Sequence, residues 1–321
     1  MKPEDLNILV IGDIMLDEYI IGTVDRISPE APVPIVLEND RKYCLGGCGN
    51  VANNLNNLKV NTTCLSVIGF DESGNTINNL LREKNIKNIG IYSTTPTTTK
   101  TRIVTDNNIQ LLRVDKEVIE YPEYKKYEIK NQIKSILTDN LYDIIIISDY
   151  NKGIIFEDAI SIISFYKKTA IIIADIKPNN IKYLKEDIYL LKPNEKEYNK
   201  IKEMCIHSTY TLKTLGKNGM VLLDGLDIVQ TVKSIPVEVY NVSGAGDTVM
   251  AVLATCIGLN KDIHTSVFIA NECGRYVVQF PDTTPIDYNF FLNLLYSDLT
   301  EKVNATLSKI CNTIPSNPKC S

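Results

Sequence analysis

Short, unbroken runs of apolar residues recur along this chain. The first run, Leu6–Ile11, is closed by Gly12 and Asp13. A run of this length without polar alternation is typical of a strand that is buried on both faces of a parallel sheet. The same pattern returns at Cys64–Ile68, Ile144–Ile147, Ala170–Ala174, Ile188–Leu191 and Met220–Leu223.

Segments with helical character separate several of these runs. The clearest are Asp71–Lys84 and Glu157–Lys168, and Asp71 is suited to cap the first of them. Strands that alternate with helices indicate βαβ units. The sequence therefore predicts an α/β fold with a doubly wound, mostly parallel sheet.

Two stretches interrupt this alternation. Residues 18–45 contain Pro29, Pro32 and Pro34, which exclude a helix and a central strand. Residues 97–115 alternate like an exposed hairpin that turns at 106–108. We expect both stretches, within about 18–45 and 95–116, to form a small β lid inserted into one domain that covers residues 1–321.

Composition narrows the classes of partner. Of the 321 residues, 44% are hydrophobic and 23% are charged, which suits a folded domain with a large core. The net charge of -5 gives no basic footprint for nucleic acid. The N-terminus has no basic flank, and its apolar run is too short for a signal peptide. No apolar run reaches the roughly 18 residues of a membrane span. We therefore expect a cytoplasmic protein that binds neither nucleic acid nor membranes, and a frayed end after Lys302.

Cysteine and histidine offer little chemistry. The eight cysteines form no CxxC pair, so the sequence does not predict a zinc site. We expect the cysteines to be reduced thiols. The two histidines, His207 and His264, stand far apart in the sequence, which favours surface or packing roles.

The segment Val242–Thr248 carries the sharpest chemical signal. Gly244 and Gly246 permit a tight turn in front of the apolar helical stretch Val249–Ile257, and the N–H groups of such a turn hold phosphate charge without using side chains. Asp247 follows directly, where a hydroxyl would approach the phosphate. We interpret it as the base that orients the hydroxyl; a glycine-rich helix cap is the plain structural alternative.

A second glycine cluster lies near the N-terminus. Gly46 and Gly47 precede a helix rich in small residues, and Asn50 offers a donor and an acceptor to sugar hydroxyls. Asp13 and Asp17 follow the first strand at its carboxyl end, which is where open α/β sheets hold ligands. Each aspartate taken alone is also a common turn or capping residue.

These motifs together closely resemble the D-glycero-β-D-manno-heptose 7-phosphate kinases, a branch of the ribokinase/PfkB family of carbohydrate kinases. The likeness spans roughly residues 6–285. It rests on Gly12–Asp17, Asp25–Pro34, Gly46-Gly47, Thr99–Arg102, Gln110–Asp115, Ser148–Gly153, Pro193–Glu197 and Ser243–Asp247.

The resemblance implies a three-layer ribokinase-like core with a small β-sheet lid. It further implies transfer of the ATP γ-phosphate to the anomeric hydroxyl of the heptose 7-phosphate, with Mg²⁺ as cofactor. In the family, the residue that matches Asp247 is the base, and the backbone of Gly244, Ala245 and Gly246 forms the anion hole.

By the same matching, Asp17, Gly46, Gly47 and Asn50 hold the sugar. The Asn-x-x-Glu motif, Asn194, Glu195, Lys196 and Glu197, organises Mg-ATP, with Glu197 acting on magnesium indirectly. The residues that resemble the nucleotide lining are Thr214, Gly216, Gly219 and Asn271.

A basic pair suggests how a substrate phosphate is held. Lys100 and Arg102 lie two positions apart in an alternating strand, so they face the same side and suit a phosphate clamp; a solvated basic face is the equal alternative. Arg26, in the lid, is a further candidate for a phosphate contact, with the same alternative. Asp149 and Lys177 are further candidates for substrate contact.

The chain also departs from the family pattern. Cys48-Gly49 replaces the usual Ala-Ala after the paired glycines. Asn241 stands where relatives commonly have aspartate, and 280–284 lacks the expected glycine-rich turn, which weakens the presumed monovalent-cation site. No nucleotidyltransferase domain follows, so we expect a separate nucleotidyltransferase and a phosphatase to continue the pathway.

Other functions remain open at this point. Another kinase of the same family, acting on fructose, ribose or a related sugar, is the main alternative, and a sugar-binding regulator without catalysis is the second. A dinucleotide-dependent oxidoreductase is excluded because the first strand lacks GxGxxG. We also expect a homodimer, because a lone lid would expose an unpaired apolar edge.

Overall fold

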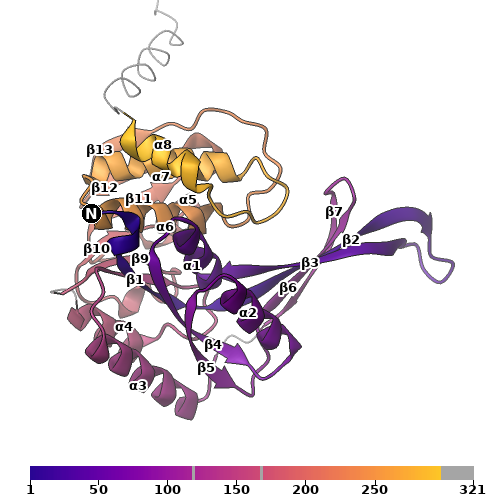
Figure 1. Cartoon of the computed structure of the whole chain (residues 1–321), viewed down its shortest axis with the longest axis horizontal. Helices are drawn as coiled ribbons and strands as arrows, with labels where there is room; N and C mark the ends of the chain where they lie inside the picture. Colours follow the sequence, from indigo (N-terminus) through magenta and orange to yellow (C-terminus); the bar gives the residue numbers. More distant parts are fainter. Residues whose placement is uncertain (118–119, 167–168, 298–321) are drawn as a thin grey trace, which may run out of the picture.

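The computed structural model of the chain describes residues 1–117, 120–166 and 169–297 (Figure 1). Its main sheet has nine strands in the order β13-β12-β11-β10-β9-β8-β1-β4-β5. The strands are β1 (Asn7–Gly12), β4 (Asn61–Gly69), β5 (Lys87–Ser93), β8 (Ile144–Ser148), β9 (Ile171–Asp175), β10 (Ile188–Leu191), β11 (Ser208–Thr214), β12 (Met220–Asp224) and β13 (Asp227–Val232). The predicted α/β, mostly parallel sheet is confirmed.

Helices cover both faces of this sheet because its strands are apolar on both sides. Along β1, Ile8 and Val10 pack into one core, whereas Leu9 and Ile11 pack into the other. The first core is closed by α1 (Cys48–Asn57), α2 (Glu72–Glu83), α6 (Ala245–Gly258), α7 (Ile263–Val277) and α8 (Tyr288–Tyr296). The second is closed by α3 (Glu123–Asp139), α4 (Glu157–Phe165) and α5 (Glu195–Ile201). The result is three layers, which Figure 1 shows with α8 and α3 on opposite sides.

The predicted boundaries differ from the structure in a few places. Asp71 caps α2 as expected, since its carboxylate accepts a 2.9 Å hydrogen bond from the Gly74 amide. The helix predicted over 157–168 ends at Phe165, and residues 167–168 lie outside the described part. The end predicted to fray after Lys302 also lies outside it. In the described ranges, no helix is long and apolar enough to cross a membrane.

The run Met220–Leu223 was wrongly interpreted as a parallel strand. It forms β12, which pairs antiparallel with both β11 and β13. The reason lies in its connections: the 3₁₀ helix η4 (Gly216–Asn218) and the turn at Gly225 are too short for a crossover, which a parallel pair requires.

The lid is a second sheet of four strands in the order β3-β2-β6-β7. These are β2 (Ile14–Ile27), β3 (Pro34–Gly47), β6 (Thr99–Thr105) and β7 (Gln110–Lys116). The hairpin of β2 and β3 projects far from the body (Figure 1). The exclusion of a central strand was wrong for β2, which lies between β3 and β6, because the three prolines fall only after its last residue.

Candidate active site

The amino end of α6 brings the predicted anion hole and base together. Gly244 has φ 79°, the left-handed conformation that favours glycine, and α6 begins at Ala245. A Cβ atom on Gly244 would lie 2.5 Å from Asn50 Nδ2 and 2.8 Å from Thr283 Cγ2. Only glycine therefore lets this turn lie so close to its neighbours, and α6 then presents the backbone N–H groups of its first turn.

Asp247 lies in that first turn with both carboxylate oxygens engaged. The Tyr150 hydroxyl donates to Oδ1 at 2.5 Å, and Asn50 Nδ2 donates to Oδ2 at 2.9 Å. Burial raises the pKa of Asp247 to about 6, although the two hydrogen bonds oppose this shift. A fixed carboxylate with a pKa near neutrality suits a general base. Tyr150 was not predicted as a site residue, and its place beside Asp149 in the Ser148–Gly153 motif was the available signal.

The loop with the paired glycines packs against β2. A Cβ on Gly46 would lie 2.4 Å from the Asp17 carboxylate, and one on Gly47 would lie 2.2 Å from the Asp13 carbonyl oxygen. Cys48 is fully buried, and its thiol donates to the Gly12 carbonyl oxygen at 3.2 Å. The loop is thus held by close backbone packing, and the Cys48 thiol contacts the core.

Asp13 and Asp149 hold the loop that carries Tyr150. Asp13 accepts hydrogen bonds from the backbone amides of Tyr150, Lys152 and Ile154 at 2.8 to 3.3 Å. Asp149 is fully buried and accepts from the Lys177 amide and the Asn180 side chain, both at 2.9 Å. Burial raises the pKa of Asp13 to about 6, and the charge of Asp149 adds to that shift. Both carboxylates are used to order backbone.

The predicted basic clamp divides into two environments. Arg102 is buried and forms an ion pair of 2.6 Å with Asp17, and its guanidinium lies 5.2 Å from the ring centre of Tyr19. Lys100 Nζ lies 5.6 Å from the ring centre of Tyr150. Burial lowers the pKa of Lys100. Lys100 therefore lies next to the Tyr150 side chain that contacts Asp247.

Arg26 lies apart from this group. It is exposed and pairs with Ile35 near the far end of β2. At about 3.3 Å per residue, that position is roughly 30 Å along the strand from Asp17. Within one chain, Arg26 is not brought to the other candidate residues.

A second charged group next to Tyr150 is a network that includes Lys177. Lys177 Nζ is 2.7 Å from Glu197 Oε1 and 5.2 Å from the centre of the Tyr150 ring. Although burial opposes its charge, Asp175 and Glu197 hold the pKa of Lys177 above its usual range. Asp175 also forms a 2.7 Å ion pair with the buried Lys192. Lys192 Nζ would lie 3.6 Å from a Cβ on Gly246, so its charge is next to the anion hole.

Asp175 and Lys192 were missed from the sequence. Each directly follows a buried apolar run, at the carboxyl end of β9 or β10, where parallel sheets place ligand-binding groups. That position was the signal. The same position at the end of a strand led to the prediction of Asp13 and Asp17.

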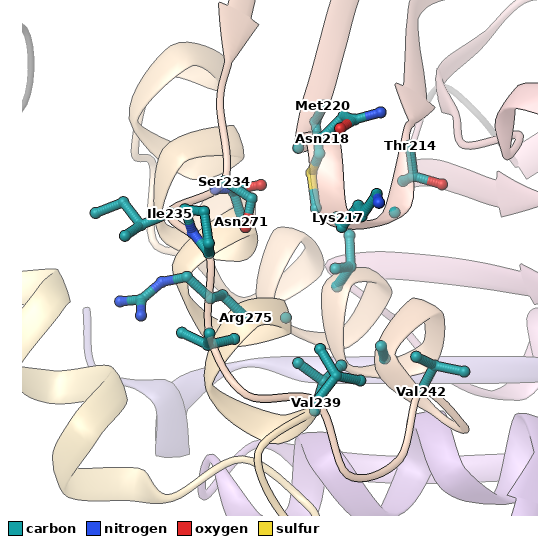
Figure 2. Close-up of a pocket in the computed structure, with 18 of the residues that line it drawn as sticks. Thr214, Lys217, Asn218, Met220, Ser234, Ile235, Val239, Val242, Asn271 and Arg275 are labelled. Carbon is teal, nitrogen blue, oxygen red and sulfur yellow. The ribbon is translucent and has the colours of Figure 1, made fainter. Parts of the chain in front are cut away.

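A cavity of about 600 Å³ adjoins the anion hole (Figure 2). Figure 2 shows Thr214 and Lys217 on one side and Asn271 and Arg275 on the other. The four residues predicted to line the nucleotide, Thr214, Gly216, Gly219 and Asn271, all line this cavity. Its apolar lining includes Ile235, Pro236, Val237, Val239, Val242, Val249 and Val278. Such walls suit an adenine ring, and Ala245 and Gly246 at one end suit the phosphates.

The Asn-x-x-Glu motif forms the start of α5. Asn194 Oδ1 accepts from the Glu197 amide at 3.0 Å, and Glu197 Oε2 accepts from the Asn194 amide at 2.9 Å, which is a capping box. Asn194 also bridges to Thr214 of the cavity wall. Glu195 and Lys196 are exposed in the same turn. The motif thus contacts the cavity wall through Asn194 and Thr214, and it contacts Lys177 through Glu197.

The family profile that matches this arrangement is described as pfkB family carbohydrate kinase, and it covers residues 5–287. The chain belongs to the pfkB family of carbohydrate kinases. The predicted family and the predicted ATP-dependent carbohydrate kinase activity are thereby confirmed.

Relatives of this kinase include two proteins named bifunctional protein HldE. The one from a Nitratiruptor species is 32% identical over 296 residues, with 87% of this chain and 62% of the relative covered. The one from Sulfurimonas denitrificans is 36% identical over 294 residues, with 85% and 60% covered. The chain thus spans less than two thirds of the length of these relatives.

Solved kinases share the fold at low identity. Phosphofructokinase-2 from Escherichia coli in complex with substrates and products aligns with a TM-score of 0.74 and 18% identity, covering 90% of this chain and 98% of that one. The same protein in complex with potassium aligns with a TM-score of 0.73 and 17% identity, covering 90% and 97%. These solved structures support the fold of this chain.

The residues of this kinase fit the divalent metal that carbohydrate kinases of this family use with ATP. The described residues contain no cluster of three or more side chains that would cage a metal on its own. However, Asp175 Oδ1 is buried without a hydrogen-bond partner within the described part of the chain. Asp175 and Glu197 both form ion pairs with Lys177, at 3.6 and 2.7 Å. Oxygen donors of this kind suit Mg²⁺ that keeps water and binds phosphates.

Proposed function

We propose that this kinase transfers the γ-phosphate of ATP to the anomeric hydroxyl of D-glycero-β-D-manno-heptose 7-phosphate, giving the heptose 1,7-bisphosphate. The observation that carries the proposal is Lys100, a partly buried lysine on the lid sheet beside the ring of Tyr150, whose hydroxyl contacts Asp247. A neutral sugar gives no reason to bury a cation there, whereas a sugar phosphate does. The motif Asp25–Pro34 supports the heptose branch.

The site residues divide the work of the transfer. Asp247 accepts the proton of the attacking hydroxyl, and Tyr150 and Asn50 keep its carboxylate oriented. The amides of the first turn of α6 and the buried Lys192 stabilise charge on the transferred phosphate. Lys177 links Glu197 to Asp175, the two carboxylates that would hold magnesium. When bound, magnesium neutralises phosphate charge.

A panel of sugars and sugar phosphates tests this proposal. We expect ATP consumption to be fastest with the heptose 7-phosphate, and NMR to place the new phosphate on the anomeric carbon. Preferred phosphorylation of fructose or ribose would replace the proposal by the main alternative. Binding of sugars without ATP consumption would favour the regulator.

We expect Lys100→Ala to raise the KM for the heptose 7-phosphate about 10 to 100-fold, because a hydrogen bond to a charged group contributes about 1.5–3 kcal/mol. The KM for the unphosphorylated heptose should change less than about threefold, because it lacks the contact. Steady-state kinetics on both sugars measures the difference. Lys130→Ala is the control, because Lys130 lies on α3 and pairs with Asp158 of α4, away from the site. Equal losses on both sugars would contradict the assignment of Lys100.

We also propose a cytoplasmic homodimer in which two lids pack together. The outer strand β7 is exposed throughout, including Leu111, Leu112 and Val114, and exposed apolar residues on an edge strand favour pairing. Light scattering at tens of micromolar should give twice the mass of the chain. In addition, Leu112→Lys should shift the mass toward that of one chain. A monomeric mass for the unmodified protein would contradict the dimer.

A further inference from the structure

The loop at 280–284 contacts both the lid and the turn that begins α6. Thr283 contacts the lid through a 3.1 Å hydrogen bond between its hydroxyl and the Tyr19 hydroxyl. Asp282 forms a 3.2 Å ion pair with Lys42 of β3. Thr283 also packs against Gly244, since a Cβ there would lie 2.8 Å from Thr283 Cγ2. The position of this loop is therefore coupled to both the lid and the anion hole.

Asn241 joins this loop to the segment that enters α6. Its side-chain Nδ2 donates to the Pro281 carbonyl oxygen at 3.1 Å, and its Oδ1 accepts from the Ser243 amide at 2.8 Å. The reverse orientation of the amide would place oxygen against the Pro281 oxygen and NH₂ against the Ser243 N–H. The neighbours thus fix which end of the amide faces which group.

This arrangement does not fit a monovalent cation. The presumed cation site between 241 and 280–284 would need oxygen atoms that converge on the ion, and a carboxylate at 241 would supply charge as well. Here the group that faces the Pro281 carbonyl oxygen is an N–H donor, which carries partial positive charge and cannot bind a cation. A bound ion would have to compete with a hydrogen bond that is already formed.

We propose that the Asn241 amide replaces the monovalent cation in bridging the Pro281 loop to the Ser243–Asp247 turn, so that this kinase needs no potassium. The Nδ2–H group satisfies the Pro281 oxygen, and Oδ1 orders the turn by holding the Ser243 amide. Aspartate at this position would instead set a carboxylate oxygen against the Pro281 oxygen. That repulsion is relieved only when a cation enters between them, so Asn241→Asp should create a potassium requirement.

Initial rates in potassium chloride and in choline chloride at equal ionic strength test the proposal. The unmodified kinase should differ less than about twofold between the salts, whereas Asn241→Asp should lose about tenfold in choline and recover in potassium, as expected for the loss of about 1.4 kcal/mol of hydrogen bonding. Asn241→Ala removes the bridge without adding charge. It should be slow in both salts. Asn79→Asp on α2 is the control for added charge, because Asn79 is exposed and its side chain accepts a 3.0 Å hydrogen bond from Arg82 of the same helix.

Thermal unfolding without any sugar gives a second readout that does not depend on the heptose assignment. Potassium should raise the unfolding midpoint of Asn241→Asp and leave those of the unmodified protein and Asn79→Asp unchanged relative to choline. Strong activation of the unmodified kinase by low millimolar potassium would overturn the proposal. So would Asn241→Asp with equal rates and midpoints in both salts, or Asn241→Ala with the rate of the unmodified protein.

Discussion

Asp247→Asn is expected to lower kcat by about 10²–10⁴-fold, the usual contribution of a positioned general base. The amide keeps the size of the carboxylate and one oxygen acceptor, so ATP and sugar should bind with nearly unchanged affinity. What it loses is the ability to take the proton of the attacking hydroxyl. Single-turnover rates together with equilibrium binding of both ligands separate these effects.

The control for this variant is Asp262→Asn at the start of α7. Asp262 accepts a 2.9 Å hydrogen bond from the Thr265 amide, and asparagine caps a helix equally well, so activity should stay near that of the unmodified kinase. The kcat/KM of the unmodified kinase should fall as the pH drops through about 6, where Asp247 becomes protonated. Asp13 also has a pKa of about 6, so it could cause the same fall in rate. If the fall near pH 6 is absent in Asp247→Asn, it is due to Asp247. An Asp247→Asn rate within threefold of the unmodified one would refute the role.

Gly244→Ala is expected to reduce kcat by about 10²–10³-fold, the cost of losing a donor from an oxyanion-type hole. The new methyl group cannot be accommodated, because it would lie 2.5 Å from Asn50 Nδ2 and 2.8 Å from Thr283. The turn must then shift, and with it the amides that face the phosphate. Asn50 would also move away from Asp247 Oδ2. Steady-state kinetics with saturating ATP measures the loss.

The matched control is Gly225→Ala in the turn between β12 and β13. Gly225 has φ 58°, and nothing lies within 4 Å of a Cβ built there. It therefore adds the backbone strain of a left-handed alanine, about 1 kcal/mol, without a clash and away from the site. If Gly225→Ala and Gly244→Ala lose activity equally, general destabilisation explains both variants and the anion hole is not supported.

The elements that sequence patterns predicted best are those that burial alone determines. Strands β1, β8 and β10 are unbroken apolar runs because both faces of each strand are covered, and their bounds differ by at most a residue from the prediction. Helix α6 followed from the glycine turn and the small apolar residues after it. In each case the signal is contained in a few consecutive residues.

What the patterns could not predict are contacts between distant segments. Arg102 and Asp17 were both expected to face the substrate, yet 85 residues of chain separate two side chains that form one ion pair. Strand alternation predicts which face a side chain occupies but not its partner. Tyr150 likewise contacts Asp247, 97 positions away, from a loop whose backbone Asp13 holds.

Strand β2 leaves β1 after a single residue, Asp13, whose carboxylate is tied to the loop at 150–154. Asp17, Lys100 and Arg102 lie on the lid sheet, whereas Asp247, the anion hole and the nucleotide cavity belong to the body. In the proposed function, the contacts to the substrate phosphate thus lie in other stretches of the sequence than the phosphoryl chemistry. If the lid residues hold the acceptor as proposed, mutations in the lid strands should change which sugar is accepted and leave the nucleotide cavity intact.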